Sequence, residues 1–239
     1  MKTRERILKI FNETSWDSIA SRYEPHFGQL IDLIVQPGWI CVDIGAAVGL
    51  ITERLALKVG PQGYVYAFEA HPENARILEN YMTDLGYSDR VKVENTAVAN
   101  KTRKLWLFPG RGRSAFEWNI IGHDVEGVET QPELEIDAIA LDDYFSKGTR
   151  LDLIKIDIEG AAGFALAGMK CILHECRPIL LIEFHNSVEW QARNHLYDEH
   201  YKLWDLVRGD LIVRGNDVAS TYHCCAIPSE FNINLSFSS

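Results

Sequence analysis

The spacing of apolar residues along the chain changes near position 36. Before it, apolar side chains recur every three or four positions over residues 16–23 and again over 27–34, which predicts two helices. Glu24-Pro25 separates them, because a residue that precedes proline disfavours the helical conformation. After position 36, short apolar runs alternate with helical stretches. We therefore expect an N-terminal helical extension over 1–36, followed by a single domain over 37–239.

The alternation after position 36 predicts a mostly parallel sheet with helices on both faces, an α/β fold. The tail predicts a helix near 188–200 and strands near 203–213 and 222–227, which could close the sheet as an antiparallel hairpin. The expected strands of the main part cover residues 39–44, 64–69, 90–98, 151–157 and 178–184, and the expected helices cover 49–57, 72–85 and 161–173.

Residues 101–145 depart from this alternation and are interpreted as an insertion. Strand-like runs at 104–108 and 134–141 flank a polar, glycine-rich stretch over 110–132. A stretch of that length between two core units is typical of a lid or a substrate loop. Arg111 and Arg113 lie in it and could contact an anionic acceptor, although a solvated loop is the simpler interpretation of that run.

Composition narrows the class of partner. The chain has 239 residues, 46% of them hydrophobic, and a net charge of −10, which is large enough for a substantial core and too acidic for a long track that binds nucleic acid. No run approaches the ~18 apolar residues of a membrane span. The odd count of five cysteines fits reduced thiols that fill the core, with neighbours Cys224 and Cys225 on opposite faces of a strand. We expect a soluble, cytoplasmic protein that binds a small molecule, without a nucleic-acid or membrane partner.

The end of the first strand indicates the charge of that molecule. In an open parallel sheet, ligands bind beyond the carboxyl ends of the strands. Here Asp43 ends the strand, and the turn that follows has Ala47 where a dinucleotide-binding motif has its middle glycine. Asp43 would repel a pyrophosphate and attract a ligand that carries an amino group and a sulfonium. S-adenosylmethionine has both groups and no phosphate.

The next two strand ends favour a nucleoside. Glu69 at the end of the second strand can accept hydrogen bonds from both hydroxyls of a ribose, and Asn95-Thr96 follow the third strand where an adenine edge would lie. The expected cofactor contacts are Asp43, Gly45, Ala46, Ala47, Gly49, Glu69, Ala70, Asn95, Thr96, Ala97 and Asp157.

These residues belong to motifs that resemble the FkbM-type S-adenosylmethionine-dependent methyltransferases. The most particular are Leu141-Asp142-Asp143 and Lys155-Ile156-Asp157-Ile158-Glu159-Gly160-Ala161; the others lie at 42–49, 68–69, 95–98 and 178–183, and the match covers about 39–186. The resemblance implies a Rossmann-like class I methyltransferase fold, with a seven-stranded sheet whose last strand is antiparallel. It also implies O-methyl transfer to a hydroxyl of a sugar, polyketide or other secondary metabolite.

One position departs from the family pattern. The family usually has Glu directly after Gly-Ala, whereas this chain has Ala162 followed by Gly163. If that acid shapes the substrate pocket, this chain takes an unusual acceptor or has lost activity.

Methyl transfer to a hydroxyl benefits from a base, since a neutral alcohol is a poor nucleophile. His185, after the fifth strand, is our candidate because an imidazole titrates near neutrality. Asp157 could orient it or hold the cofactor's amino group, and Glu159 completes the expected catalytic set. A divalent ion held by Asp157 with Glu183 or His185 is the alternative, but we expect no metal. Lys155 lies within the strand and is interpreted as structural, with its amine reaching the surface or a partner.

Two other functions remain open from the sequence. One is a nicotinamide-dependent oxidoreductase, against which the missing glycine motif counts; the other is a non-catalytic S-adenosylmethionine-binding protein on the same scaffold, which Ala162 keeps open. The acceptor has no recognisable signature. The helical N-terminus offers a surface for a homodimer.

Overall fold

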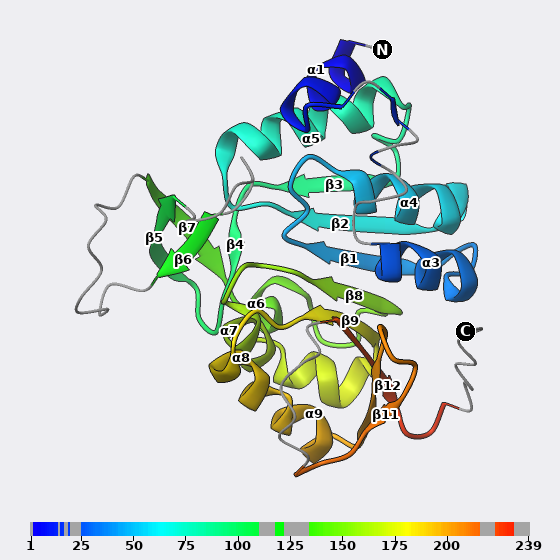
Figure 1. The fold of residues 1–239 in the computed structure, drawn as a ribbon, viewed down its shortest axis with the longest axis vertical. Coiled ribbons are helices and arrows are strands. Elements are labelled where there is room, and N and C mark those ends of the chain that lie inside the picture. Colours follow the sequence, from blue (N-terminus) through cyan, green and yellow to red (C-terminus); the bar gives the residue numbers. More distant parts are fainter. Residues whose placement is uncertain are drawn as a thin grey trace.

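The computed structural model describes residues 2–13, 15–16, 19, 25–109, 118–121, 134–215 and 223–231 (Figure 1). Its helices are α1 (Lys2–Ile10), α3 (Pro25–Ile34), α4 (Leu50–Val59), α5 (Pro72–Asp84), α6 (Leu141–Tyr144), α7 (Ala162–Ala167), α8 (Ser187–Ala192) and α9 (Asn194–Asp198), with a 3₁₀ turn at Gly60–Gln62 and a π-helical turn at Ile172–Cys176. Its strands are β1 (Ile40–Ile44), β2 (Tyr64–Phe68), β3 (Val91–Glu94), β4 (Ala97–Val98), β5 (Arg103–Pro109), β6 (Trp118–Ile121), β7 (Leu134–Ile139), β8 (Leu153–Ile156), β9 (Ile179–Glu183), β10 (Tyr201–Asp205), β11 (Leu211–Ile212) and β12 (His223–Pro228).

The main sheet has the strand order β11-β10-β12-β9-β8-β1-β2-β3. The pairs from β9 through β8 and β1 to β3 are all parallel, and β12 is antiparallel to both β9 and β10. The expected parallel sheet with an antiparallel last strand is therefore confirmed. The two-residue strand β11, which pairs antiparallel with β10, adds an eighth strand to the seven that the resemblance implied.

Helices cover both faces of this sheet, because alternate residues of the buried strands point to opposite sides. One apolar cluster joins the β1 side chain of Cys41 to α1, α3, α4 and α5, and the other joins that of Val42 to α6, α7, α8 and α9. Cys224 and Cys225 divide between the same two clusters, as expected for neighbours in a strand. All five cysteines are free thiols.

The insertion forms a second sheet of order β4-β7-β5-β6, beside the end at which β1, β2 and β3 finish (Figure 1). The single strand expected over 90–98 is in fact two, because the chain leaves the main sheet after Glu94 and enters the second at Ala97. Likewise, the helix expected over 188–200 is two, α8 and α9, and that over 161–173 is the short α7 followed by the π-helical turn. The stretch 110–117 and 122–133, with Arg111 and Arg113, lies outside the described residues.

The N-terminal helices share the core of the main sheet. Arg4 of α1 binds Glu53 of α4 at 2.6 Å, and Tyr81 of α5 donates to the same carboxylate at 2.6 Å. Ile7 and Phe27 are fully buried in the cluster that lines β1 and β2. The division at residue 36 remains a prediction. Within the described residues, no helix is long and apolar enough to cross a membrane.

Candidate functional site

The turn after β1 is shaped by left-handed backbone at Gly45 (φ 77°), Ala47 (φ 49°) and Gly49 (φ 98°). These values favour glycine, and Ala47 is the one residue among the three that carries a side chain against this preference. A Cβ on Gly45 would lie 1.8 Å from the main-chain oxygen of Asp157, so no larger residue fits there. The turn therefore lies directly against the end of β8.

Glu69 holds this turn from the end of β2. One carboxylate oxygen accepts from the main-chain N–H of Ala47 and the other from that of His71, both at 2.8 Å. Its side chain is buried, and burial raises its pKa while these hydrogen bonds counteract the rise. Asn95 lies beside it and donates to the main-chain oxygens of Glu69 and Ala70 at 2.9 and 3.1 Å. Glu69, Ala70, Ala47 and Asn95 thus meet as one group.

Thr96 and Ala97 turn away from that group. The Thr96 hydroxyl donates to the main-chain oxygen of Asp137 at 2.9 Å, and Ala97 is buried in the second sheet. Ala46 is buried beneath the turn. Contact between these three residues and a cofactor remains a prediction.

Asp43 is fully buried and is already paired in this structure. One of its oxygens accepts from the Thr52 hydroxyl at 2.6 Å, and the other lies 3.6 Å from the amine of Lys155. Lys155 is itself only 1% exposed; its amine donates to the main-chain oxygen of Gly45 at 3.1 Å and lies 3.6 Å from Asp157. The interpretation of Lys155 as a structural residue fits these contacts, but its amine does not reach the surface. Asp43 and Lys155 face each other across β1 and β8 in the sheet register.

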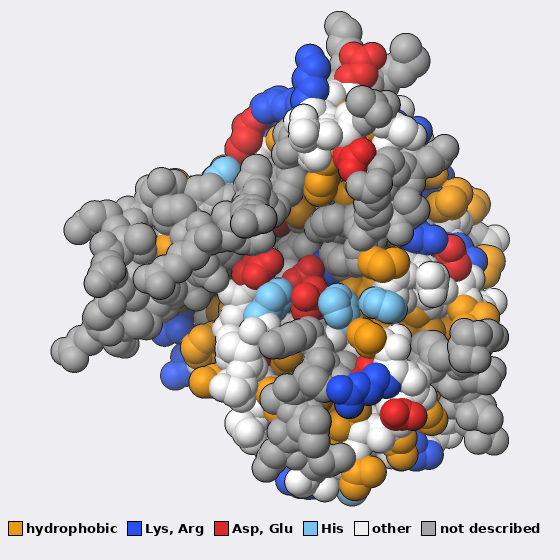
Figure 2. All heavy atoms as spheres, viewed as in Figure 1, with side chains coloured by type: hydrophobic (Ala, Val, Ile, Leu, Met, Phe, Trp, Pro, Cys, Tyr) orange, Lys and Arg blue, Asp and Glu red, His pale blue; other side chains and the backbone are white. Residues whose placement is uncertain are grey.

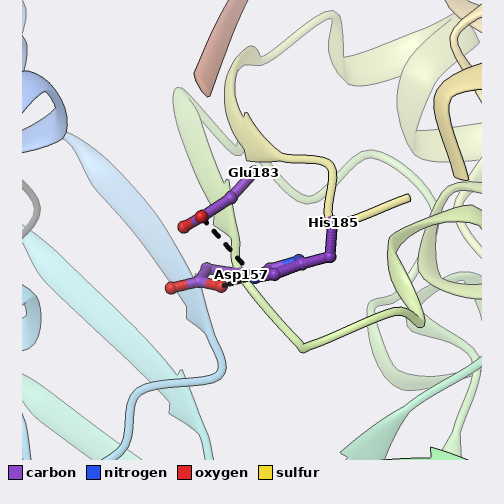
Figure 3. Close-up of side chains that lie close together, drawn as sticks. All are labelled: Asp157, Glu183 and His185. Atoms are coloured by element: carbon purple, nitrogen blue, oxygen red, sulfur yellow. Dashed lines mark ion pairs between the residues drawn. The ribbon is translucent and has the colours of Figure 1, made fainter. Parts of the chain in front are cut away.

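A histidine surrounded by carboxylates forms the other half of the site, at the ends of β8 and β9 (Figure 3). The Nε2 atom of His185 lies 3.4 Å from Asp157, 3.3 Å from Glu159 and 3.6 Å from Glu183. Figure 2 shows histidine and acidic side chains side by side across the middle of this face, where the surface is hollowed. The structure thus brings together all three expected catalytic residues.

The pKa values in this cluster are displaced by burial and by like charge. The pKa of Glu183 rises to about 7, first because burial disfavours its charge and then because Asp157 lies close by. Burial also lowers the pKa of His223, whose Nε2 atom lies 3.5 Å from Glu183. Such displaced values concentrate at functional sites.

Asp157, Glu183 and His185 also offer the donor atoms that a divalent cation takes. One ligand atom from each residue lies within 4.8 Å of the others. Mixed oxygen and imidazole sets suit Mn²⁺ or Zn²⁺. The arrangement can therefore serve either as a base flanked by carboxylates or as a metal-binding site.

The sequence did not lead us to expect Glu189, His223 or His26 at this site. The ring of His223 lies 5.6 Å from that of His26 and 5.2 Å from that of Phe27, so α3 forms part of the wall near the cluster. His26 carries no motif that could have drawn attention to it. Lys155 offered a local signal. It lies in β8 two positions before Asp157, and side chains two positions apart in extended chain point to the same face.

Comparison with known proteins identifies the family. Residues 43–208 match the family model described as the methyltransferase FkbM domain. No curated protein matches. Among solved structures, the chain is similar to the FkbM methyltransferase of Methylobacillus flagellatus KT, with a TM-score of 0.56 and 19% identity over 87% of this chain and 47% of that one. It is also similar to cofactor-bound Rv0187 from MTB, with a TM-score of 0.52 and 15% identity over 97% of this chain and 91% of that one.

These two likenesses support the Rossmann-like fold, and this chain spans about half of the Methylobacillus protein. The family match covers most of the chain, from the strand end at Asp43 to the residues just beyond β10. The chain belongs to the FkbM family of methyltransferases, which use S-adenosylmethionine as the methyl donor.

Proposed function

We propose that this chain transfers a methyl group from S-adenosylmethionine to a hydroxyl of a small molecule, such as a sugar, a polyketide or another secondary metabolite. The observation that carries the proposal is the position of His185, with its Nε2 atom facing three carboxyl groups beside the turn after β1. An imidazole so placed can accept a hydroxyl proton at neutral pH.

The residues around the turn suit a nucleoside bound at the ends of β1 and β2. The two oxygens of Glu69 accept from two main-chain N–H groups and from the side chain of Asn74. A carboxylate offers about four acceptor positions, so acceptor capacity remains for a ribose hydroxyl. The short side chain at Ala47 and the glycines at 45 and 49 leave the backbone open to a ligand. These residues fit the donor, and we assign them to hold it together with Asn95.

In this proposal Asp43 supports the cofactor site indirectly. Its charge is opposed by Lys155 and its second oxygen is bound to Thr52, so it holds the turn in place. Asp157, which is partly exposed and lies between Lys155 and His185, is the carboxylate placed to face the donor's amino group.

The bound donor supplies an electrophilic methyl group on a sulfonium. His185 Nε2 would take the hydroxyl proton as the oxygen–methyl bond forms and the sulfur–methyl bond breaks, which leaves S-adenosylhomocysteine. Asp157 and Glu159 would stabilise the resulting imidazolium. The proton then passes to solvent. Holding the acceptor oxygen in line is itself worth several kcal/mol of the barrier.

The test is turnover of labelled S-adenosylmethionine with a panel of hydroxylated acceptors, compared between the native protein and His185→Ala. We expect product from the native protein and a loss of about 100-fold or more in the variant. Product excludes the non-catalytic alternative. Undiminished turnover in the variant would exclude His185 as the base.

Two controls separate the remaining alternatives. Calorimetry should show binding of S-adenosylhomocysteine and none of NADH, because Ala47 stands where a dinucleotide-binding motif has its middle glycine. Turnover should also survive a chelator, since His185 can act without a metal. Activity that falls in EDTA and returns with Mn²⁺ or Mg²⁺ would instead assign Asp157, Glu183 and His185 as ligands.

A further inference from the structure

A buried carboxylate, Glu189 of α8, lies on the far side of the His185 ring from the other acids. Its side chain is 3% exposed, and one of its oxygens accepts from the main-chain N–H of His185 at 2.7 Å. The same oxygen lies 3.8 Å from the ring atom Nδ1. That Nδ1 atom is buried and has no hydrogen-bond partner among the residues that the structure describes.

Glu189 owes this position to the way in which α8 begins. The side chain of Asn186 caps the helix by accepting from the main-chain N–H groups of Val188 and Glu189, at 3.0 and 2.9 Å. Glu189 is therefore the third residue of the helix, which in a capping box accepts from the capping residue's own N–H. Here the carboxylate accepts instead from the residue before the cap, His185.

The second oxygen of Glu189 reaches another helix. It accepts from the main-chain N–H of Ala162, the first residue of α7, at 2.6 Å. Ala162 is the position at which the resembling family usually carries Glu. The Glu189 carboxylate of α8 thus binds the main chain at Ala162, where this chain lacks the usual Glu. It links α7, α8 and the segment that carries His185.

The two ring nitrogens of His185 have different surroundings. Nε2 faces Asp157, Glu159 and Glu183 on the hollowed face, where an acceptor can reach it. Nδ1 is closed off from solvent, and Glu189 is the acceptor beside it. A buried ring nitrogen that is left without a hydrogen bond is destabilising. A ring displacement of roughly 1 Å brings Nδ1 within hydrogen-bond distance of Glu189.

We propose that Glu189 is the positioning residue of the site: it keeps a proton on Nδ1 of His185 and so leaves the Nε2 lone pair for the acceptor hydroxyl. The catalytic part of this inference rests on the proposed function. A carboxylate accepts hydrogen bonds and does not donate them, so beside Nδ1 it selects the tautomer with N–H at that atom. It also stabilises the imidazolium that forms when Nε2 takes a proton. Asp157, Glu159 and Glu183 draw the proton toward Nε2, and Glu189 opposes them.

The tautomer can be measured directly, without an acceptor and without activity. Long-range ¹H–¹⁵N correlation spectra of the native protein, recorded under conditions in which the His185 ring is neutral, should show the proton on Nδ1. A neutral His185 with its proton on Nε2 overturns the proposal, whatever the protein catalyses. Absence of any methyl transfer would overturn the proposed function and leave this measurement valid.

The variant Glu189→Gln separates positioning from capping. Its amide can donate to Nδ1, so we expect the proton to move to Nε2 and turnover to fall roughly 100-fold. The affinity for S-adenosylhomocysteine should stay within about threefold. In a His185→Ala background, the same change should lower turnover no further. Equal losses in both backgrounds, or an unchanged tautomer, would reduce Glu189 to a capping residue.

Glu79→Gln is the matched control, since Glu79 is an exposed glutamate of another helix, α5. It should change neither the tautomer nor turnover. If Glu189→Gln does not fold, Glu189→Asp provides the second variant. Its shorter side chain should weaken the hold on Nδ1 while keeping the charge, with a smaller loss of turnover than the amide causes.

Discussion

At the scale of single residues, the centre of the molecule is an internal ion cluster. Lys155 lies 3.6 Å from both Asp43 and Asp157, and its side chain is 1% exposed. Burial of a lysine is costly unless its charge is paired and hydrogen-bonded, which the two carboxylates and the oxygen of Gly45 provide.

Replacement of this lysine by methionine should destabilise the fold strongly. Lys155→Met leaves Asp43 fully buried without its counter-charge, and the loss of one partner of such a pair typically costs about 3–5 kcal/mol. We expect the free energy of unfolding in urea to fall by that order. The double variant Asp43→Asn with Lys155→Met should recover part of the loss; no recovery would show that the pairing does not stabilise the fold.

Glu69 should matter for the cofactor more than for the fold. Glu69→Gln removes the charge that would receive a ribose hydroxyl, and a hydrogen bond to a charged group is worth about 1.5–3 kcal/mol. We expect the Kd of S-adenosylhomocysteine, measured by calorimetry, to rise by roughly 10- to 100-fold. An unchanged Kd would remove Glu69 from the proposed cofactor site, and Glu79→Gln serves again as the control.

Contacts between residues that are far apart in the sequence set the limit of what could be predicted for the site. The expected catalytic residues His185, Asp157 and Glu159 do lie close together. This could be predicted because the apolar runs in the sequence show where the strands end. The burial of the Lys155 amine could not be predicted, because its partner Asp43 is 112 positions away and the contact depends on the register of β1 with β8. No local pattern carries that information.

At the scale of elements, the turn after β1 and the end of β8 form one contact. Gly45 has a φ of 77° and no room for a Cβ, because the main-chain oxygen of Asp157 would lie 1.8 Å from it. The turn after β1 and the end of β8 therefore cannot shift independently.

This contact can be tested against a glycine with the same backbone conformation and free space around it. Gly45→Ala should destabilise the protein by more than the ~1–2 kcal/mol of left-handed strain alone, since its Cβ also meets backbone. Gly38→Ala, at φ 83° with nothing within 4 Å, should show the strain alone. Equal changes in the midpoint of denaturation would contradict the crowding at Gly45.

The main elements could be predicted because period and turn residues are local signals. The breaks between consecutive elements could not be predicted. The end of β3 at Glu94 and the start of β4 at Ala97 depend on which sheet each segment joins, and the apolar pattern of 90–98 continues through both. The division of residues 188–200 into α8 and α9 likewise depends on which part of the core each short helix covers.

At the scale of the whole molecule, the acidic cluster links stability to pH. The pKa of Glu183 is about 7 in the folded protein, above its usual 4.5, so the folded state binds more protons between these values. The stabilising contribution of this group is thus complete below pH 4.5 and is lost as the pH rises through 7.

Comparison with Glu183→Gln isolates this effect. The native protein should lose on the order of 3 kcal/mol of unfolding free energy between pH 4.5 and 8 through this group, and the variant should lack that decline. Urea denaturation at several pH values provides the measurement. Parallel curves for the native protein and the variant would show that Glu183 titrates normally.

The chain enters and leaves the second sheet at neighbouring points. β4 pairs with β7 through Ala97 with Ala138 and Val98 with Ile139, so the segment between them begins and ends side by side. A segment connected in this way could be replaced by another sequence without a change in the order of the strands in the eight-stranded sheet.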